Sequence, residues 1–380
     1  MKALNDKQTD NKSNIQNALC KETSVRILKT LAATLLASSS VYAADIGGIT
    51  VNGEIAFDYN FSQDGISVPF AGGASNEIYR INTSQILAKK ETEQVYVLAR
   101  LVYNPTTYVT QASPEVKSTS NLGMLDQVEV YYKPRPNIYI GAGRFLTTMG
   151  YESVLRSENL FYGYTIAFQG ITPGYGEGLR ARYVAGDYLT ATISTYNQSR
   201  YNIYGDDYTP TKTTEVSANG TLGDLQWFAG YFFGKDTAQA PSTGTAENTS
   251  SNIWASYRIN ENLLIAAMYD SKTNKPESGV VGWSDATTGL VNYKLWNNSF
   301  SVRYEMIRGA MHMREFDNAV YGNADKVNSL TLNDKIALNE NFHVYVEYRA
   351  DQADEEVFEK DDTTLTKNAQ LLTLGALASF

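Results

Sequence analysis

The sequence is poor in the residues that ligate metals and form disulfides. Its 380 residues include one cysteine, Cys20, and two histidines. Cys20 lies in a segment that we expect to be removed, so the mature chain has no thiol, no disulfide and no cysteine-ligated metal. No cluster of metal-ligating residues is visible either. We therefore expect neither a metal nor a cofactor.

Long apolar runs and an excess of positive charge are also missing. No run of about 18 apolar residues occurs, so we expect no membrane-spanning helix. The net charge of −9 argues against nucleic acid as a partner. A membrane barrel remains compatible with this composition, because only alternate residues of its strands need to be apolar.

The N-terminal segment predicts export. An apolar run, "TLAATLLASSS" (30–40), follows a basic region and precedes a small-residue site ending at Ala43. This order is that of a secretory signal peptide. We expect residues 1–43 to be the signal, cleaved between Ala43 and Ala44, and residues 44–380 to be one mature domain. The polar residues 1–20 lengthen the leader, which leaves open a translation start downstream of Met1.

The mature chain shows strict two-residue alternation. In "FHVYVEYR" (342–349), apolar Phe342, Val344 and Val346 share one face, and Glu347 and Arg349 lie on the other. Comparable alternation recurs over 50–61, 94–103, 127–133, 178–184, 225–233, 263–269 and 300–306. Segments of helical period and similar length are absent. The pattern predicts an all-β fold.

Short and long connections alternate along the chain. Seven short breaks fall at 89–92, 134–136, 185–187, 223–224, 260–262, 297–298 and 339–341. Eight longer polar stretches lie near 62–76, 105–121, 147–176, 197–212, 235–250, 272–287, 309–325 and 351–365. This is the arrangement of a transmembrane antiparallel up-and-down β-barrel of about 16 strands, with short periplasmic turns and long external loops. Its apolar faces would contact lipid and its charged faces a wet lumen. A soluble two-domain sandwich is the alternative.

The third long connection carries a family resemblance. "GAGRFLTTMGYESVLRSENLFYGYTIAF" (141–168) resembles the OmpL-like β-barrel porin (porin-2) family through Gly143, Arg144, Phe145, Gly150, Tyr151, Glu152, Asn159 and Tyr162. The resemblance implies an outer-membrane channel for ions and small hydrophilic solutes, whose third loop, about 146–176, folds into the barrel. It also implies a homotrimer. The final strand ends at Phe380 and resembles the C-terminal signal that the barrel insertion machinery reads.

Charged residues on the inward faces are the candidates for control of permeation. Arg144, Arg180 and Arg182 flank the long loop, whose acidic residues are Glu152 and Glu158. Basic wall residues facing an acidic loop would create a transverse field in the channel. The remaining candidates are Glu54, Asp58, Arg100, Glu129, Arg303, Glu305, Glu347 and Arg349. In the alternative interpretation these are ordinary solvated charges, or Arg182 pairs structurally with Glu129.

The two alternative functions are an outer-membrane hydrolase and a surface adhesin. An outer-membrane hydrolase would need a nucleophile beside His343 or His312, and no nucleophile motif is visible. We therefore expect no enzyme. A surface adhesin would need active loops, and "TAQAPSTGTAENTSS" (237–251) is typical of a solvated loop. The expected partners are outer-membrane lipid, lipopolysaccharide, the insertion machinery and further copies of the chain.

Overall fold

The computed structural model describes residues 44–45, 47–62, 78–103, 125–197, 212–237, 245–277, 281–315, 318–319, 321–361 and 364–380. Statements about the structure refer to these residues. The expected signal peptide, residues 1–43 with Cys20 and Ala43, lies outside them. Ala44, the expected first mature residue, begins the short strand β1 (Ala44–Asp45), which pairs with β2.

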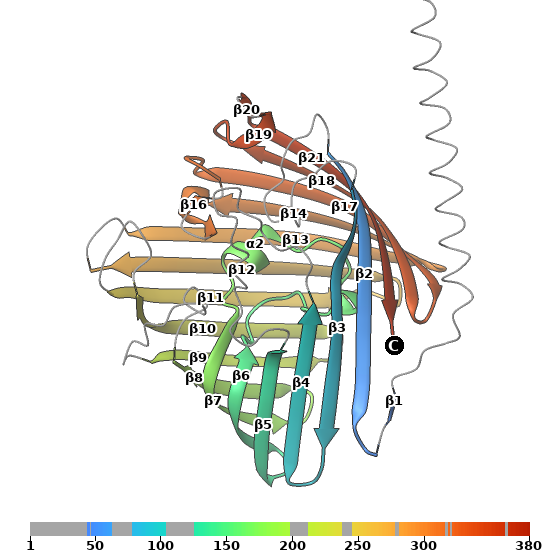
Figure 1. The fold of residues 1–380 in the computed structure, drawn as a ribbon, viewed down its shortest axis with the longest axis vertical. Helices are drawn as coiled ribbons and strands as arrows, with labels where there is room; N and C mark the ends of the chain where they lie inside the picture. The colour runs from blue at the N-terminus through green and yellow to red at the C-terminus, as the bar shows by residue number, and fades with distance from the viewer. Residues whose placement is uncertain are drawn as a thin grey trace, which may run out of the picture. The chain divides into compact units, whose positions relative to one another are not determined.

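Sixteen antiparallel strands form a closed ring (Figure 1). Each strand pairs with the next along the chain, and β21 closes the ring against β2. The strands are β2 (Thr50–Ser62), β3 (Ile78–Glu91), β4 (Val95–Tyr103), β5 (Leu125–Arg135), β6 (Ile138–Leu146), β7 (Tyr175–Ala185), β8 (Leu189–Tyr196), β9 (Thr213–Leu222), β10 (Leu225–Thr237), β11 (Thr245–Arg258), β12 (Leu263–Pro276), β13 (Gly282–Leu295), β14 (Asn298–Arg308), β17 (Lys326–Asn339), β18 (Phe342–Ala353) and β21 (Asn368–Ser379). The predicted barrel and its strand count are confirmed.

In the described residues, helix is confined to short pieces. These are η2 (Arg156–Glu158), α2 (Ile166–Gly170) and η4 (Ala310–His312). Within the described ranges, none of them is long and apolar enough to span a membrane. Two small hairpins, β15 (Arg314–Glu315) with β16 (Asn318–Ala319) and β19 (Phe358–Asp361) with β20 (Thr364–Thr366), form separate two-stranded sheets.

Each of the seven predicted short breaks overlaps one of the seven tight connections, although residues 89–91 belong to β3 and residues 134–135 to β5. At the opposite end of the barrel, two predicted long loops, 235–250 and 272–287, are partly wrong. β10 continues to Thr237, β11 already begins at Thr245, and β13 begins at Gly282. The predicted loop 351–365 likewise contains β19 and part of β20. Polar residues there still pair along the strands, because backbone hydrogen bonding does not require an apolar side chain.

The two faces of the strands differ as the alternation predicts. Val346 is 40% exposed, whereas its neighbours Tyr345 and Glu347 are 0% and 4% exposed. The same contrast recurs around the ring, where the exposed large side chains are mainly Ile, Leu, Val, Phe and Tyr and most of the buried polar ones face inward. An apolar exterior around a polar interior is the reverse of a soluble fold.

Close strand approach makes Gly178 intolerant of substitution. A Cβ added there would lie 1.8 Å from the Thr195 carbonyl oxygen of the neighbouring strand. Gly178→Ala should therefore force β7 and β8 apart and lower the unfolding free energy by about 1–3 kcal/mol. Urea unfolding in lipid vesicles measures this change. Gly289→Ala in β13 is the matched control, since no atom lies within 4 Å of its Cβ position. Equal unfolding midpoints for the two variants would contradict the prediction.

Candidate functional site

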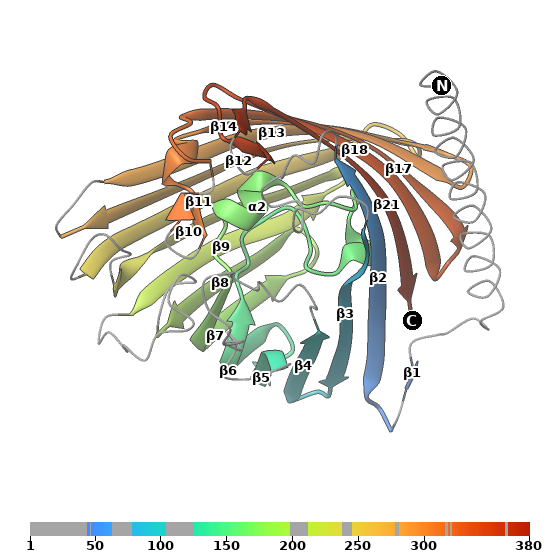
Figure 2. The same cartoon turned by 45° about the horizontal axis from the view of Figure 1, so that its top comes forward.

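Residues 147–174, which join β6 to β7, are hereafter the lumenal segment. Figure 2 shows this segment and α2 within the ring of strands. Its backbone is hydrogen-bonded to side chains of β2, β9, β11, β14, β17 and β18. Strands on several sides of the ring therefore hold one connection across the interior.

Two wall carboxylates hold the centre of the segment. Glu54 accepts hydrogen bonds from the backbone N–H groups of Arg156 and Ser157, at 2.8 and 3.0 Å, and from the Ser157 hydroxyl at 2.7 Å. Glu347 accepts from the N–H groups of Tyr162 and Gly163, both at 2.9 Å. An irregular segment lacks ladder partners for these donors, and an ionised carboxylate satisfies several of them at once.

A third carboxylate holds the beginning of the segment. Glu215 of β9 accepts from the Thr148 N–H at 2.8 Å and from the hydroxyls of Thr147 and Thr148 at 2.8 and 2.6 Å. The next turn is held by β11, where Asn252 Oδ1 accepts from the Gly150 N–H at 3.0 Å.

The wall also supplies donors for the carbonyl groups of the segment. Arg303 of β14 donates to the carbonyl oxygens of Gly163 and Tyr164 at 3.1 and 3.3 Å. Lys335 of β17 donates to those of Ser157 and Asn159 at 2.9 and 3.1 Å. Asn333, Trp254 and Gln85 each donate to one further carbonyl group of the segment.

One ion pair joins the segment to the wall through side chains. Arg303 Nη1 lies 2.8 Å from Glu152 Oε1, and the two side chains are 1% and 7% exposed. Glu152 also accepts from the Thr165 N–H and hydroxyl, both at 2.7 Å, at the start of α2. The guanidinium stacks over the Phe161 ring at 4.4 Å. Arg303 thus binds a carboxylate, two carbonyl groups and an aromatic ring of the segment.

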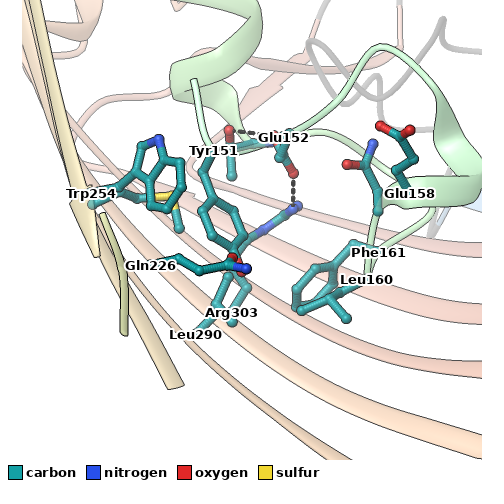
Figure 3. A pocket seen from close by; sticks show the side chains of 12 residues that line it. Tyr151, Glu152, Glu158, Leu160, Phe161, Gln226, Trp254, Leu290 and Arg303 are labelled. Atoms are coloured by element: carbon teal, nitrogen blue, oxygen red, sulfur yellow. Dashed lines mark hydrogen bonds and ion pairs between the residues drawn. The ribbon is translucent and has the colours of Figure 1, made fainter. Parts of the chain in front are cut away.

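Apolar residues of the segment pack on apolar inward residues. Phe161 contacts Ala266, Met268 and Leu290, and Met149 belongs to a cluster with Tyr131, Phe145, Tyr196, Phe228 and Phe232. A cavity of about 190 Å³ remains between segment and wall (Figure 3). It is lined by Tyr151, Glu152, Glu158, Asn159, Leu160, Phe161, Thr165, Gln226, Trp254, Met268, Leu290 and Arg303. Burial raises the pKa of Tyr151, beside this cavity, to about 12, so its hydroxyl stays neutral at physiological pH.

The predicted site residues fall into two sets. Glu54, Asp58, Arg303, Glu305 and Glu347 contact the lumenal segment, to which Glu152 and Glu158 belong. Other predicted residues pair within the wall. Arg349 binds Asp351 through bonds of 2.7–3.1 Å, and Arg100 binds Asp126 and the Tyr175 hydroxyl.

The arginines near the segment do not face Glu152 and Glu158 as expected. Arg180 lies 4.0 Å from each of two wall carboxylates, Glu129 and Glu215. Arg182 stacks over the Tyr139 ring at 4.4 Å, so the wall arginine next to Glu129 is Arg180. Glu152 pairs with Arg303, and Glu158 is exposed.

The inward placement of Arg144 is wrong. Arg144 is the cross-strand partner of Val128 and Glu177, on the face of β6 that carries Ile140, which is 55% exposed. Buried Phe145 takes the adjacent inward position. Polarity is inverted only at this end of β6, because inward Phe145 belongs to the apolar cluster that contains Met149.

Six of the wall residues that hold the segment were not among the predictions. All six lie on inward strand faces: Gln85, Glu215, Asn252, Trp254, Asn333 and Lys335. Glu215 and Lys335 could have been found from this alternation alone. The two asparagines and the tryptophan carry no signal that separates them from other lumen residues.

A closed sixteen-stranded barrel with an apolar exterior and a polar interior defines a membrane pore protein of the bacterial outer membrane. The sequence matches the family described as "Putative beta-barrel porin-2, OmpL-like" over residues 48–380. The chain belongs to this family, and it is an outer-membrane porin. The soluble sandwich is thereby excluded.

Solved structures share the fold at low sequence identity. OmpT of Vibrio cholerae has a TM-score of 0.59 at 14% identity, covering 89% of this chain and 100% of that chain. The outer-membrane channel DcaP of Acinetobacter baumannii has a TM-score of 0.57 at 13% identity, covering 90% and 100%. An anion-selective porin from Comamonas acidovorans has a TM-score of 0.59 at 10% identity, covering 87% and 99%. No curated protein matches the sequence.

Proposed function

We propose that this porin is a water-filled channel for passive diffusion of ions and small hydrophilic solutes, narrowed by the lumenal segment. The observation that carries the proposal is the attachment of residues 147–174 to inward side chains of strands on several sides of the ring. A ring of sixteen strands is wide enough for an aqueous channel, and a segment held across it leaves less space for solutes.

The proposal gives the inward charges two roles and assigns no catalytic group. Glu54, Glu347 and Arg303 hold the segment in place. Arg182, Glu129, Asp58, Arg100, Glu305, Arg349 and Glu158 are proposed to line the water or to pair beside it. Arg144, which faces outward, belongs to neither group.

Export and assembly complete the proposal. We infer cleavage between Ala43 and Ala44, and contact of the apolar exterior with outer-membrane lipid and lipopolysaccharide. Phe380, proposed as the signal for the insertion machinery, exchanges two backbone hydrogen bonds of 2.8 Å with Gly53 of β2. OmpT of Vibrio cholerae is described in a trimer form, and we propose a homotrimer here by analogy.

Single-channel recording of refolded residues 44–380 in a planar bilayer tests the channel. We expect stable open steps well above the bare-bilayer baseline. A protein that folds and inserts but never conducts would overturn the proposal and favour a role in surface interaction.

A further inference from the structure

Two lysines and a serine form one row on the inner face of β13, β14 and β17. Lys294 and Lys335 are both cross-strand partners of Ser299, one on each side of it. Next to this row, Asn292 and Ser301 are buried on the same face, which places the row in the lumen. The row lies toward the short-turn end, because β13 ends at Leu295 and β14 begins at Asn298. Short turns are periplasmic in outer-membrane barrels.

Arg182 faces this row from the opposite wall. It lies on β7, eight positions from β17 in the ring of sixteen, and it is likewise near the short-turn end of its strand. Its guanidinium rests on the rings of Tyr139 and Tyr131, and its Nε lacks a hydrogen-bond partner in the described part of the chain. Cations therefore approach the same level of the lumen from both sides.

The nearby inward carboxylates already have other partners, as does Glu129, which lies 4.0 Å from Arg180 and accepts from the Tyr131 hydroxyl. Glu54 is used by the lumenal segment, as described above. Glu91 lies 2.9 Å from Lys133 and 3.5 Å from Lys89, so two lysines already share it. The acidic residues Asp270, Glu305 and Asp351 lie toward the other end of their strands. The chain as a whole has a net charge of −9, yet the level of the lumen that holds Lys294, Lys335 and Arg182 has an excess of positive charge.

We propose that Lys294, Lys335 and Arg182 form an anion-attracting layer on the periplasmic side of the lumenal segment. Small carboxylate, phosphate and halide anions are drawn into it, and the open channel conducts anions in preference to cations. This inference rests on the proposed channel function. A general property of basic pores and one feature of the site support it. Lysine and arginine side chains around a pore select for anions, and a narrow low-dielectric passage strengthens their field. The Ser299 hydroxyl, between the two lysines, offers a further donor.

The test is the reversal potential of single channels under a KCl gradient, at about 0.1 M salt where screening extends over about 10 Å. The wild-type channel should reverse toward the equilibrium potential of chloride. Removing one charge, as in Lys294→Gln or Arg182→Gln, should lower the anion-to-cation permeability ratio by roughly twofold, the effect of a unit charge acting through water at 8–10 Å. Neither residue is hydrogen-bonded to the backbone of the lumenal segment, so both variants should still give open steps.

Arg144→Gln is the matched control, because it removes the same charge from the adjacent strand on the outward face. It should leave the reversal potential unchanged. A cation-preferring wild-type channel, or an equal shift in the control, would overturn the anion layer. The absence of any open steps would instead overturn the channel function on which the layer depends. Lys335→Gln is best measured last, since that lysine also holds the segment.

Discussion

Replacing Glu54 and Glu347 together by alanine is expected to raise the single-channel conductance and the noise of the open state. The two carboxylates accept five hydrogen bonds from the lumenal segment, at 2.7–3.0 Å. Each such bond to a charged group contributes about 1.5–3 kcal/mol. Their joint loss removes the hydrogen bonds that tie residues 156–157 to Glu54 and residues 162–163 to Glu347, so the segment is held less firmly in the centre of the channel.

Single-channel recording measures the change in conductance. A heat-unfolding midpoint equal to that of the wild type shows that the barrel is intact. Glu247→Ala is the control, since this residue pairs with Lys235 near the outer strand ends and does not touch the segment. Wild-type conductance in an intact double variant would show that these carboxylates do not hold the segment in the channel.

The barrel could be predicted from sequence because its physical cause is local. A lipid-exposed strand must satisfy its backbone within a closed sheet and must alternate its side chains. Residues 342–349 show this alternation without any knowledge of their neighbours, and the tight turn at 339–341 follows from polar residues adjacent in sequence. The ends of the strands were less predictable, since β11 begins with a polar run whose pairing continues beyond the alternating core.

The role of each charge could not be predicted in the same way. Glu54 binds Arg156 and Ser157, which are 102 and 103 residues away along the chain. A lumen-facing carboxylate can be solvated by water or can accept a hydrogen bond from an unpaired backbone N–H group. Alternation alone therefore cannot show whether it lines the channel or holds the lumenal segment. The predicted inward placement of Arg144 was wrong for a related reason. The apolar cluster inside the barrel turned Phe145 inward, which only the folded segment explains.

Replacing Arg303 by methionine is expected to destabilise the protein more than any other single change of a charged inward residue considered above. Its guanidinium is 1% exposed and lies 2.8 Å from Glu152 and 3.7 Å from Glu305. Removing it leaves two buried carboxylates without their nearest cation and two carbonyl groups of the segment without a donor. Breaking a buried ion pair from one side costs about 3–5 kcal/mol. Urea unfolding of the refolded protein in lipid vesicles measures the loss.

A second substitution separates loss of charge balance from loss of packing. Glu152→Gln in the Arg303→Met background removes one uncompensated charge and keeps an oxygen that can accept from Thr165. The double variant should therefore regain part of the lost stability. Arg308→Met is the matched control on the same strand, because Arg308 also pairs with a carboxylate, Asp285, but is 60% exposed. Exposed pairs contribute little, so this change should have a much smaller effect. If Arg303→Met and Arg308→Met shift the unfolding midpoint equally, the buried pair does not carry the stability assigned to it.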